Sequence, residues 1–263
     1  MAIPGDSHHD DGQQFSLTDT HSHLNSPHFA GRVGEVLARA AAVNVVEVVV
    51  PGWDRESSVM ALALGAAHPG IRPAVGLHPW FVAENPDLTW LPALLDDPRL
   101  VAIGEIGLDG AIDNEDPAQQ EAVFRAQLAL AAERNLPVLI HCRRRWDRLL
   151  ACLHDYPVHG VMHAFSGSLE VMRECLRLGL YISFAGMVTR PNSRRAHEAA
   201  TAVPADRLLL ETDAPYMALE GIPAEQAEPA HLPLVLDYIA NLRNTDPVTL
   251  GAISAENVKR LFV

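Results

Sequence analysis

Short apolar runs rich in β-branched residues alternate with longer helical stretches along almost the whole of this chain. The runs have the length of buried strands, and they are Phe15–Asp19, Val45–Val50, Ile71–Val75, Leu100–Gly104, Val138–His141, Gly160–His163, Leu180–Phe184 and Arg207–Glu211. The helical stretches are Gly31–Val43, Ser57–His68, Pro117–Asn135, Trp146–Tyr156, Leu169–Leu178 and Ser193–Val203. Such alternation is typical of a parallel sheet, because parallel strands need a crossover between them. It predicts an α/β fold of the (β/α)8 TIM-barrel type, with an open doubly wound sheet as the alternative.

The length of 263 residues and the 48% of hydrophobic residues allow one sizeable core. Barrels of roughly 250 residues fold as one unit, so we expect a single domain at 15–263 with extra C-terminal helices. The polar segment Met1–Gln14 lacks the basic and apolar parts of a secretory signal, and we interpret residues 1–14 as a mobile N-terminal extension. No apolar run approaches the roughly 20 residues of a membrane span. We therefore expect a cytoplasmic protein with no membrane partner.

Composition also argues against several classes of site. The cysteines Cys142, Cys152 and Cys175 are an odd number without paired spacing, which fits reduced thiols better than a disulfide framework. No glycine-rich nucleotide-binding loop follows the first strand. The formal net charge of −13 disfavours indiscriminate binding to a polyanion. An enzyme that must release a polyanionic product, however, need not be basic overall.

Side chains that can bind metal ions stand at the ends of several predicted strands. Alternate strand residues point to the same face, and the carboxyl ends of barrel strands form the mouth where these folds keep their active sites. The imidazoles and carboxylates at these ends are His21, His23, Glu105, His141, His163 and Asp213. One such residue alone is usually structural, but six at the same end of their strands predict a metal site. Asp19, two residues before His21, is expected to face the same interior.

The ligand types narrow the choice of metal. Imidazole with carboxylate suits Zn, Mn, Fe or Mg, and there is no thiolate cage for copper or an iron–sulfur cluster. Six ligands exceed what one tetrahedral ion uses, so we expect two divalent metal ions (Mg, Mn or Zn) bridged by a carboxylate. The only lysine, Lys259, lies far from any strand end, which removes a carbamylated lysine as the bridge. Glu105 remains as the candidate for that role.

Other polar residues at the mouth indicate how catalysis and substrate binding are divided. Asp213 is expected to contact a metal and to accept the proton of the attacking water, with Glu211 supporting a ligand from deeper in the barrel. The planar guanidinium group of arginine can donate two hydrogen bonds to phosphate oxygens. We therefore expect Arg143 to bind the substrate, and His78 to contribute more weakly. Further arginines gather after strands 5 and 7, at Arg144, Arg145, Arg190, Arg194 and Arg195. Three aromatic residues could stack on a base or simply pack, namely Trp80, Phe81 and Trp146.

The ordered motifs of the chain resemble those of the TatD-type metal-dependent deoxyribonucleases, within the larger group of metallohydrolase barrels. The resemblance covers nearly the whole chain, through DTHSHL at 19–24, GLHP at 76–79, GEIGLD at 104–109, LPVLIHCR at 136–143, HAFSGS at 163–168, LLLETDAPY at 208–216 and NVKRLF at 257–262. HCRRRWD and DAPYMALEG are closest to a poorly characterised bacterial branch. The resemblance implies a barrel whose metal ligands are His21, His23, Glu105, His141, His163 and Asp213.

The resemblance also implies a function, the hydrolysis of phosphodiester bonds in DNA, with exonucleolytic trimming of single-stranded ends as the expected mode. The alternative is a hydrolase of a small phosphoester, or of an amide or ester in a cyclic metabolite, with the same metal centre. A non-enzymatic binding barrel would be expected to have lost ligands, and all six are present. The arginine clusters favour DNA as the substrate, whereas the negative net charge of the chain favours the small metabolite. No oligomeric state follows from the sequence.

Overall fold

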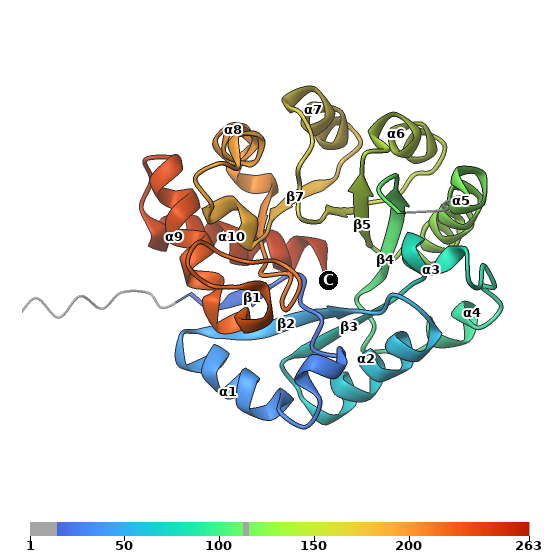
Figure 1. The fold of residues 1–263 in the computed structure, drawn as a ribbon, viewed down its shortest axis with the longest axis horizontal. Helices are drawn as coiled ribbons and strands as arrows, with labels where there is room; N and C mark the ends of the chain where they lie inside the picture. The colour runs from blue at the N-terminus through green and yellow to red at the C-terminus, as the bar shows by residue number, and fades with distance from the viewer. Residues whose placement is uncertain (1–14, 113–115, 263) are drawn as a thin grey trace, which may run out of the picture.

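Eight parallel strands form one sheet in chain order in the computed structural model, which describes residues 15–112 and 116–262. The strands are β1 (Leu17–Asp19), β2 (Val45–Pro51), β3 (Ile71–Val75), β4 (Ala102–Asp109), β5 (Val138–Arg143), β6 (Gly160–Met162), β7 (Tyr181–Phe184) and β8 (Leu208–Leu210). They surround a common axis with the helices outside them (Figure 1). The TIM-barrel prediction is thus confirmed. The extension expected at 1–14 lies outside the described residues, and the single domain at 15–263 stays a prediction.

The helices cover the outside of the barrel and extend past its last strand. They are α1 (Val33–Ala42), α2 (Arg55–Ala67), α3 (Pro79–Val82), α4 (Leu91–Leu94), α5 (Pro117–Arg134), α6 (Trp146–His154), α7 (Leu169–Arg177), α8 (Arg194–Ala202), α9 (Leu232–Leu242) and α10 (Pro247–Leu261). Short 3-10 turns are η1 (Pro27–Phe29), η2 (Gly186–Thr189), η3 (Ala205–Arg207), η4 (Ala224–Gln226) and η5 (Pro229–His231). The expected C-terminal helices are therefore α9 and α10. Within the described ranges, no helix combines the length and the apolar character needed to cross a bilayer.

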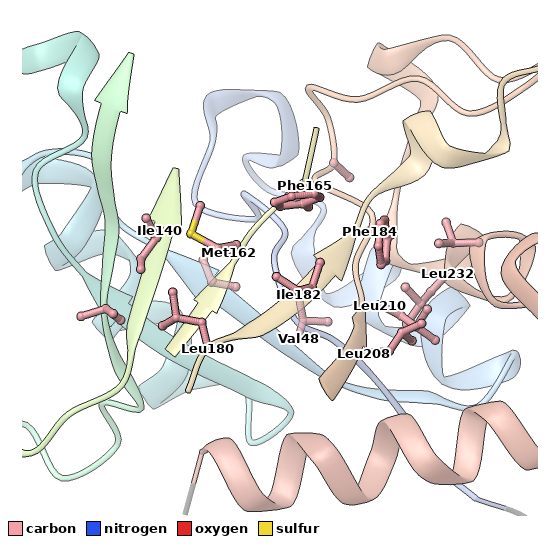
Figure 2. Packing of buried hydrophobic residues seen from close by; sticks show 14 of the residues in the cluster. Val48, Ile140, Met162, Phe165, Leu180, Ile182, Phe184, Leu208, Leu210 and Leu232 are labelled. Atoms are coloured by element: carbon pink, nitrogen blue, oxygen red, sulfur yellow. The ribbon is translucent and has the colours of Figure 1, made fainter. Parts of the chain in front are cut away.

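Alternation along the strands divides the core into two layers. Val48 and Ile140 belong to the large cluster that packs strands against helices (Figure 2), whereas their neighbours Val49 and Leu139 belong to a cluster shared among the strands. Helix α10 adds Val258 and Leu261 to that inner cluster. The side-chain amide of Asn257 in the same helix donates to the carbonyls of Ala205 and Leu208, each at 2.8 Å, where β8 begins. The C-terminal helix thus closes the end of the barrel opposite to the mouth.

The barrel closes at a seam between the residues that follow β1 and those that follow β8. The backbone amide of Thr20 donates to Leu210 O at 3.1 Å, and that of Asp213 donates to His21 O at 2.9 Å. The Asp19 carboxylate accepts from the Thr212 amide at 2.9 Å and from its hydroxyl at 2.5 Å. Asp19 therefore fastens the seam instead of joining the other acidic residues at the mouth. Burial, with a smaller effect from nearby Glu211, raises the pKa of Asp19 to about 7.

Strand β4 extends five residues beyond the Gly104 end expected from the sequence, because GEIGLD belongs to the strand. Its register against β5 shifts between Ile103, which pairs with Val138, and Ile106, which pairs with Ile140. An advance of three residues along β4 therefore spans the same length as an advance of two residues along β5. One extra residue on one strand is the pattern of a β-bulge. Both isoleucines still face the outer core, and the extra residue turns Glu105 inward. Glycine is needed at 107, where φ is +152° and a Cβ would overlap the carbonyl of His141.

Helix α5 stabilises the ends of β3 and β4 through two buried glutamines. The Gln127 amide accepts from Leu77 N at 2.8 Å and donates to Leu77 O at 3.0 Å. Gln120 does the same for the backbone of Asp109, at 2.9 and 3.1 Å. These bonds satisfy the backbone N–H and C=O groups of Leu77 and Asp109 where the two strands are no longer paired with each other. The neighbouring residues are therefore held in fixed positions. His78 follows Leu77 directly and gains its position in this way.

Candidate metal centre

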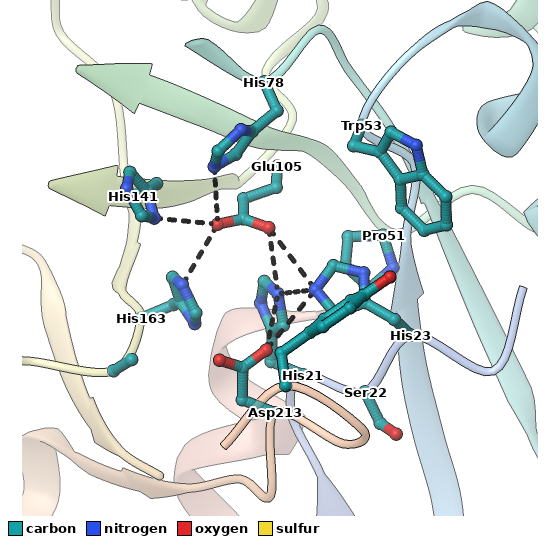
Figure 3. A network of polar contacts seen from close by, with 12 residues as sticks. His21, Ser22, His23, Pro51, Trp53, His78, Glu105, His141, His163 and Asp213 are labelled. Atoms are coloured by element: carbon teal, nitrogen blue, oxygen red, sulfur yellow. Dashed lines mark hydrogen bonds and ion pairs between the residues drawn. The ribbon is translucent and has the colours of Figure 1, made fainter. Parts of the chain in front are cut away.

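The polar side chains of the mouth continue the inward faces of their strands. On β5, Leu139 faces the inner cluster, and His141 and Arg143 follow at steps of two on the same face. Residues after β6 and β8 repeat this pattern, with His163 two residues beyond inward-facing Val161. The inner strand positions thus carry apolar residues deep in the barrel and ionisable ones at its mouth. The structure brings all six predicted metal ligands together there (Figure 3).

Glu105 lies at the middle of this cluster, and its two oxygens have different neighbours. Oε1 lies 3.1 Å from His141 Nδ1 and 3.0 Å from His163 Nε2. Oε2 lies 3.2 Å from His21 Nε2 and 3.5 Å from His23 Nε2. The carboxylate therefore divides the cluster into two halves, each with a pair of imidazole nitrogens. This arrangement suits a bridge between two cations.

Asp213 completes the half that contains His21 and His23. Its Oδ1 lies 3.3 Å from His23 Nε2 and 3.9 Å from His21 Nε2. Asp213 has a φ of +53°, and its amide is fixed at the seam by the bond to His21 O. The second oxygen, Oδ2, makes no hydrogen bond or ion pair with any described residue, and Asp213 lines the cavity above the cluster. One carboxylate oxygen is thus available to a ligand or a water.

Hydrogen bonds on the outer ring nitrogens orient His141 and His163. His141 Nε2 lies 3.2 Å from Asp109 Oδ2, and His163 Nδ1 lies 3.1 Å from Glu211 Oε1. A carboxylate partner holds the proton on the nitrogen that it contacts, so the opposite nitrogen of each ring can give its lone pair to a cation once the ring is neutral. Glu211 also accepts from the Ala164 amide at 2.6 Å. Glu211 therefore lies directly behind His163, on the side away from the cluster.

His78 joins the cluster in a different protonation form. Its Nε2 lies 3.4 Å from Glu105 Oε1, but its Nδ1 accepts the backbone N–H of Trp80 at 3.2 Å. An accepting Nδ1 leaves the proton of the neutral ring on Nε2. Burial, with a contribution from His141, lowers the pKa of His78 to about 4, so the ring is neutral at pH 7. Neutral His78 therefore presents an N–H donor beside Glu105, although it is also grouped with Glu105 and His141 closely enough to hold a metal ion.

The charge balance of the cluster favours cations. Burial alone would raise the pKa of Glu105, but His163, His78 and His21 outweigh it and hold that pKa well below its usual range. Burial likewise opposes the charged form of His163, yet Glu105 and Glu211 raise its pKa well above the usual value. Protons on the imidazoles and divalent cations therefore compete for the same carboxylates, and metal binding releases protons.

The cluster also fits a metal by its geometry and donor chemistry. His21 Nε2 and His23 Nε2 lie 3.2 Å apart with both facing the carboxylates, and two neutral rings cannot satisfy each other and Glu105 at once. The outer Nδ1 atoms of both rings are buried without a partner among the described residues. Cations would use the inward lone pairs, and imidazole and carboxylate donors suit Zn, Mn or Mg. The residues therefore fit two divalent ions.

A cavity of about 480 Å³ opens above the cluster. Arg143 lines it, as do residues that the sequence did not point to, among them Trp53, Tyr216 and Met187. Asp109 was missed as well, although it ends the GEIGLD motif: it contacts both His141 and, at 2.7 Å, the indole nitrogen of Trp80. Burial alone would raise the pKa of Asp109, but these two hydrogen bonds lower it to about 2.

Arginines around the mouth differ from those elsewhere on the surface. Several arginines away from the mouth are paired with carboxylates, as in Arg72–Glu47 at 2.6 Å and Arg134–Asp96 at 2.8 Å, while Arg243 donates to backbone carbonyls. Five guanidinium groups that follow β5 and β7 make no hydrogen bond or ion pair with the described residues, and these belong to Arg143, Arg144, Arg190, Arg194 and Arg195. In a chain with a net charge of −13, this leaves free positive charge at the mouth.

Comparison with known proteins decides the family. The family model described as "TatD related DNase" matches residues 18–263. The chain belongs to the TatD family. It is 38% identical over 94% of its length to an uncharacterised metal-dependent hydrolase, YabD of Bacillus subtilis, and covers 98% of that protein. It is thus a metal-dependent hydrolase, as the sequence predicted.

Further relatives include characterised and uncharacterised members of the TatD family. The chain is 39% identical to a protein of Klebsiella pneumoniae named 3'-5' ssDNA/RNA exonuclease TatD, and the match covers 94% of this chain and 97% of that one. Among solved structures, the TatD homologue YjjV of Escherichia coli superposes with a TM-score of 0.89 at 32% identity, over 94% of this chain and 97% of that one. The solved homologue supports the fold, and the name of the YabD relative supports the metal dependence.

We predict that Glu105→Gln lowers the metal content from two ions per chain to one or none while the barrel stays folded. The amide keeps the shape of the side chain but loses the charge that holds two cations together. Metal content is measured by mass spectrometry of the purified protein, and folding by circular dichroism. Glu256→Gln, which removes an exposed carboxylate paired with Lys259 at 2.7 Å, is the matched control. Retention of two ions by Glu105→Gln would contradict the bridging role.

Proposed function

We propose that this chain is a divalent-metal-dependent deoxyribonuclease that removes nucleotides from the ends of single-stranded DNA. The observation that carries the proposal is the pair of half-sites on either side of Glu105, with imidazoles at 3.0 and 3.1 Å from one oxygen and at 3.2 and 3.5 Å from the other. Two cations bridged by a carboxylate serve enzymes that hydrolyse phosphate esters, because they stabilise both the attacking and the leaving oxygen. The unpaired arginines at the mouth supply charge complementary to a phosphate backbone.

The ligand sets follow from the contacts. We assign one cation to His21, His23, Asp213 and Glu105, and the other to Glu105, His141 and His163. Divalent ions held there supply Lewis-acid polarisation of a phosphodiester and lower the pKa of the water that attacks it. The mixed donor set is compatible with Mg, Mn or Zn.

The residues of the chain then share the remaining tasks. Asp213 accepts the proton of the attacking water through Oδ2, since Oδ1 faces His21 and His23. His78 donates from Nε2 to an oxygen of the substrate phosphate, because its Nδ1 is occupied by the Trp80 amide. Arg143 binds a phosphate at the cavity wall, where it has no carboxylate partner among the described residues. Relatives named ssDNA/RNA exonucleases support a single-stranded substrate.

The proposal is tested with metal-stripped protein and labelled oligonucleotides, single-stranded and duplex, while Mg, Mn or Zn is titrated back. We expect stepwise shortening of single-stranded DNA that is faster than that of the duplex and absent without metal. An RNA strand of the same sequence measures the preference between nucleic acids. No cleavage of any strand by the metal-loaded protein would refute the proposal. Turnover of only a small phosphodiester would then favour the small-phosphoester alternative.

Asp213→Asn is predicted to lose at least about 10²-fold in kcat, the usual scale for general acid–base catalysis. The amide cannot accept the proton, but it leaves the four imidazole ligands and Glu105 in place, so at least one metal should remain. Turnover is measured on single-stranded DNA together with metal content. Asp237→Asn on the exposed side of α9 is the control. Wild-type turnover by Asp213→Asn would assign the base to another group.

Arg143→Ala is predicted to raise KM for DNA chiefly, with metal content unchanged. Loss of one phosphate contact should reduce the slope of log binding constant against log salt by roughly 0.7 for a single strand. Binding is measured across a salt series with a fluorescent oligonucleotide. Arg134→Ala, which removes an arginine already paired with Asp96, should leave the slope unchanged. An unchanged slope in Arg143→Ala would remove this residue from phosphate binding.

A further inference from the structure

Two aromatic side chains at the cavity are exposed to an unusual degree. Trp80 is 52% exposed and Tyr216 is 56% exposed, and both line the cavity above the metal centre. Among the described residues they are the only phenylalanine, tryptophan or tyrosine side chains that are exposed. Large apolar side chains left in water beside a cavity commonly mark a binding surface.

Both rings are held in place by hydrogen bonds. The Trp80 indole donates to Asp109 Oδ2 at 2.7 Å, and Asp109 is itself fixed by Gln120 and His141. The Tyr216 amide donates to Asp213 O at 2.8 Å, and its hydroxyl lies 3.4 Å from Ser26 Oγ. The Trp80 ring is held by a short bond, whereas for Tyr216 mainly the backbone is fixed; restraint of this kind lowers the conformational entropy that is lost when a ligand stacks.

The two rings belong to opposite halves of the metal centre. The Trp80 ring lies 5.3 Å from that of His78, which contacts Oε1 of Glu105. The Tyr216 ring lies 5.0 Å from that of His23, which contacts Oε2. A phosphodiester positioned between the two halves therefore has one aromatic surface on each side of the scissile bond.

We propose that the bases of the two nucleotides joined by the scissile bond stack on Trp80 and Tyr216, one on each ring. The inference rests on the proposed nuclease function and extends it to the recognition of the bases. Every base has a flat face, so stacking binds any sequence. Two neighbouring bases of a duplex cannot lie against two separate protein rings until they are unstacked from each other. The two rings therefore account for selectivity toward single strands, and Asp109 acts as the positioning residue for Trp80.

The test uses single-stranded oligonucleotides that lack one base, through a tetrahydrofuran residue at either nucleotide of the terminal phosphodiester. For the wild-type protein with Mn, each missing base should lower kcat/KM by roughly tenfold. Trp80→Ala and Tyr216→Ala should each lower kcat/KM on the intact strand by a similar factor. Each variant should then lose nothing more when the base that stacks on its own ring is missing, and should keep the full loss for the other base.

Two further variants distinguish a loss of base stacking from indirect damage to the metal centre. Trp80→Phe keeps a ring but loses the bond to Asp109, and it should still discriminate between the intact and the abasic strand. Met60→Ala removes an exposed apolar side chain on α2 outside the cavity and should match the wild type on all strands. Equal losses from base removal in the alanine variants and the wild type would overturn the stacking proposal alone. Absence of cleavage of the intact strand by the wild type would instead refute the nuclease function and this inference together.

Discussion

The contact between the Glu105 carboxylate and the surrounding imidazoles is the interaction on which the site depends. An unpaired carboxylate taken from water into the interior costs several kcal/mol, so this buried group requires positive charge near both oxygens. His163 meets that need 3.0 Å from Oε1, because its pKa is raised well above the usual value, whereas burial lowers the pKa of His21 beside Oε2. A cation held by His21, His23 and Asp213 would supply positive charge beside Oε2.

The fold brings these groups together by three separate means. The β-bulge in β4 turns Glu105 inward while the isoleucines on either side keep their places in the outer core. The seam closed by Asp19 and Thr212 sets the ends of β1 and β8 side by side. The glutamines of α5 fix the backbone beside His78 and Asp109. The Asp19–Thr212 pair and the two glutamines do not line the cavity, so they act on the site only through the backbone that they fix.

Much of this arrangement could be predicted from the sequence, because strand runs and the step of two along a strand are local properties. They place His141 and Asp213 at the mouth without knowledge of the fold. The bulge could not be predicted, since GEIGLD is rich in glycine and resembles a loop until its pairing with β5 is known. The partner of Asp19 could not be predicted, because Thr212 lies 193 residues away in the sequence. Tyr216 was missed because exposure on a cavity wall leaves no periodic signal.

The bridge at Glu105 is tested most directly by anomalous diffraction from crystals of the protein loaded with manganese. The account predicts two anomalous peaks, one bound by Oε1 together with His141 and His163, and one bound by Oε2 together with His21 and His23. Because the scattering comes from the metal itself, the peaks report the positions of the ions independently of activity. A single peak, or two peaks of which neither is bound by Glu105, would contradict the account.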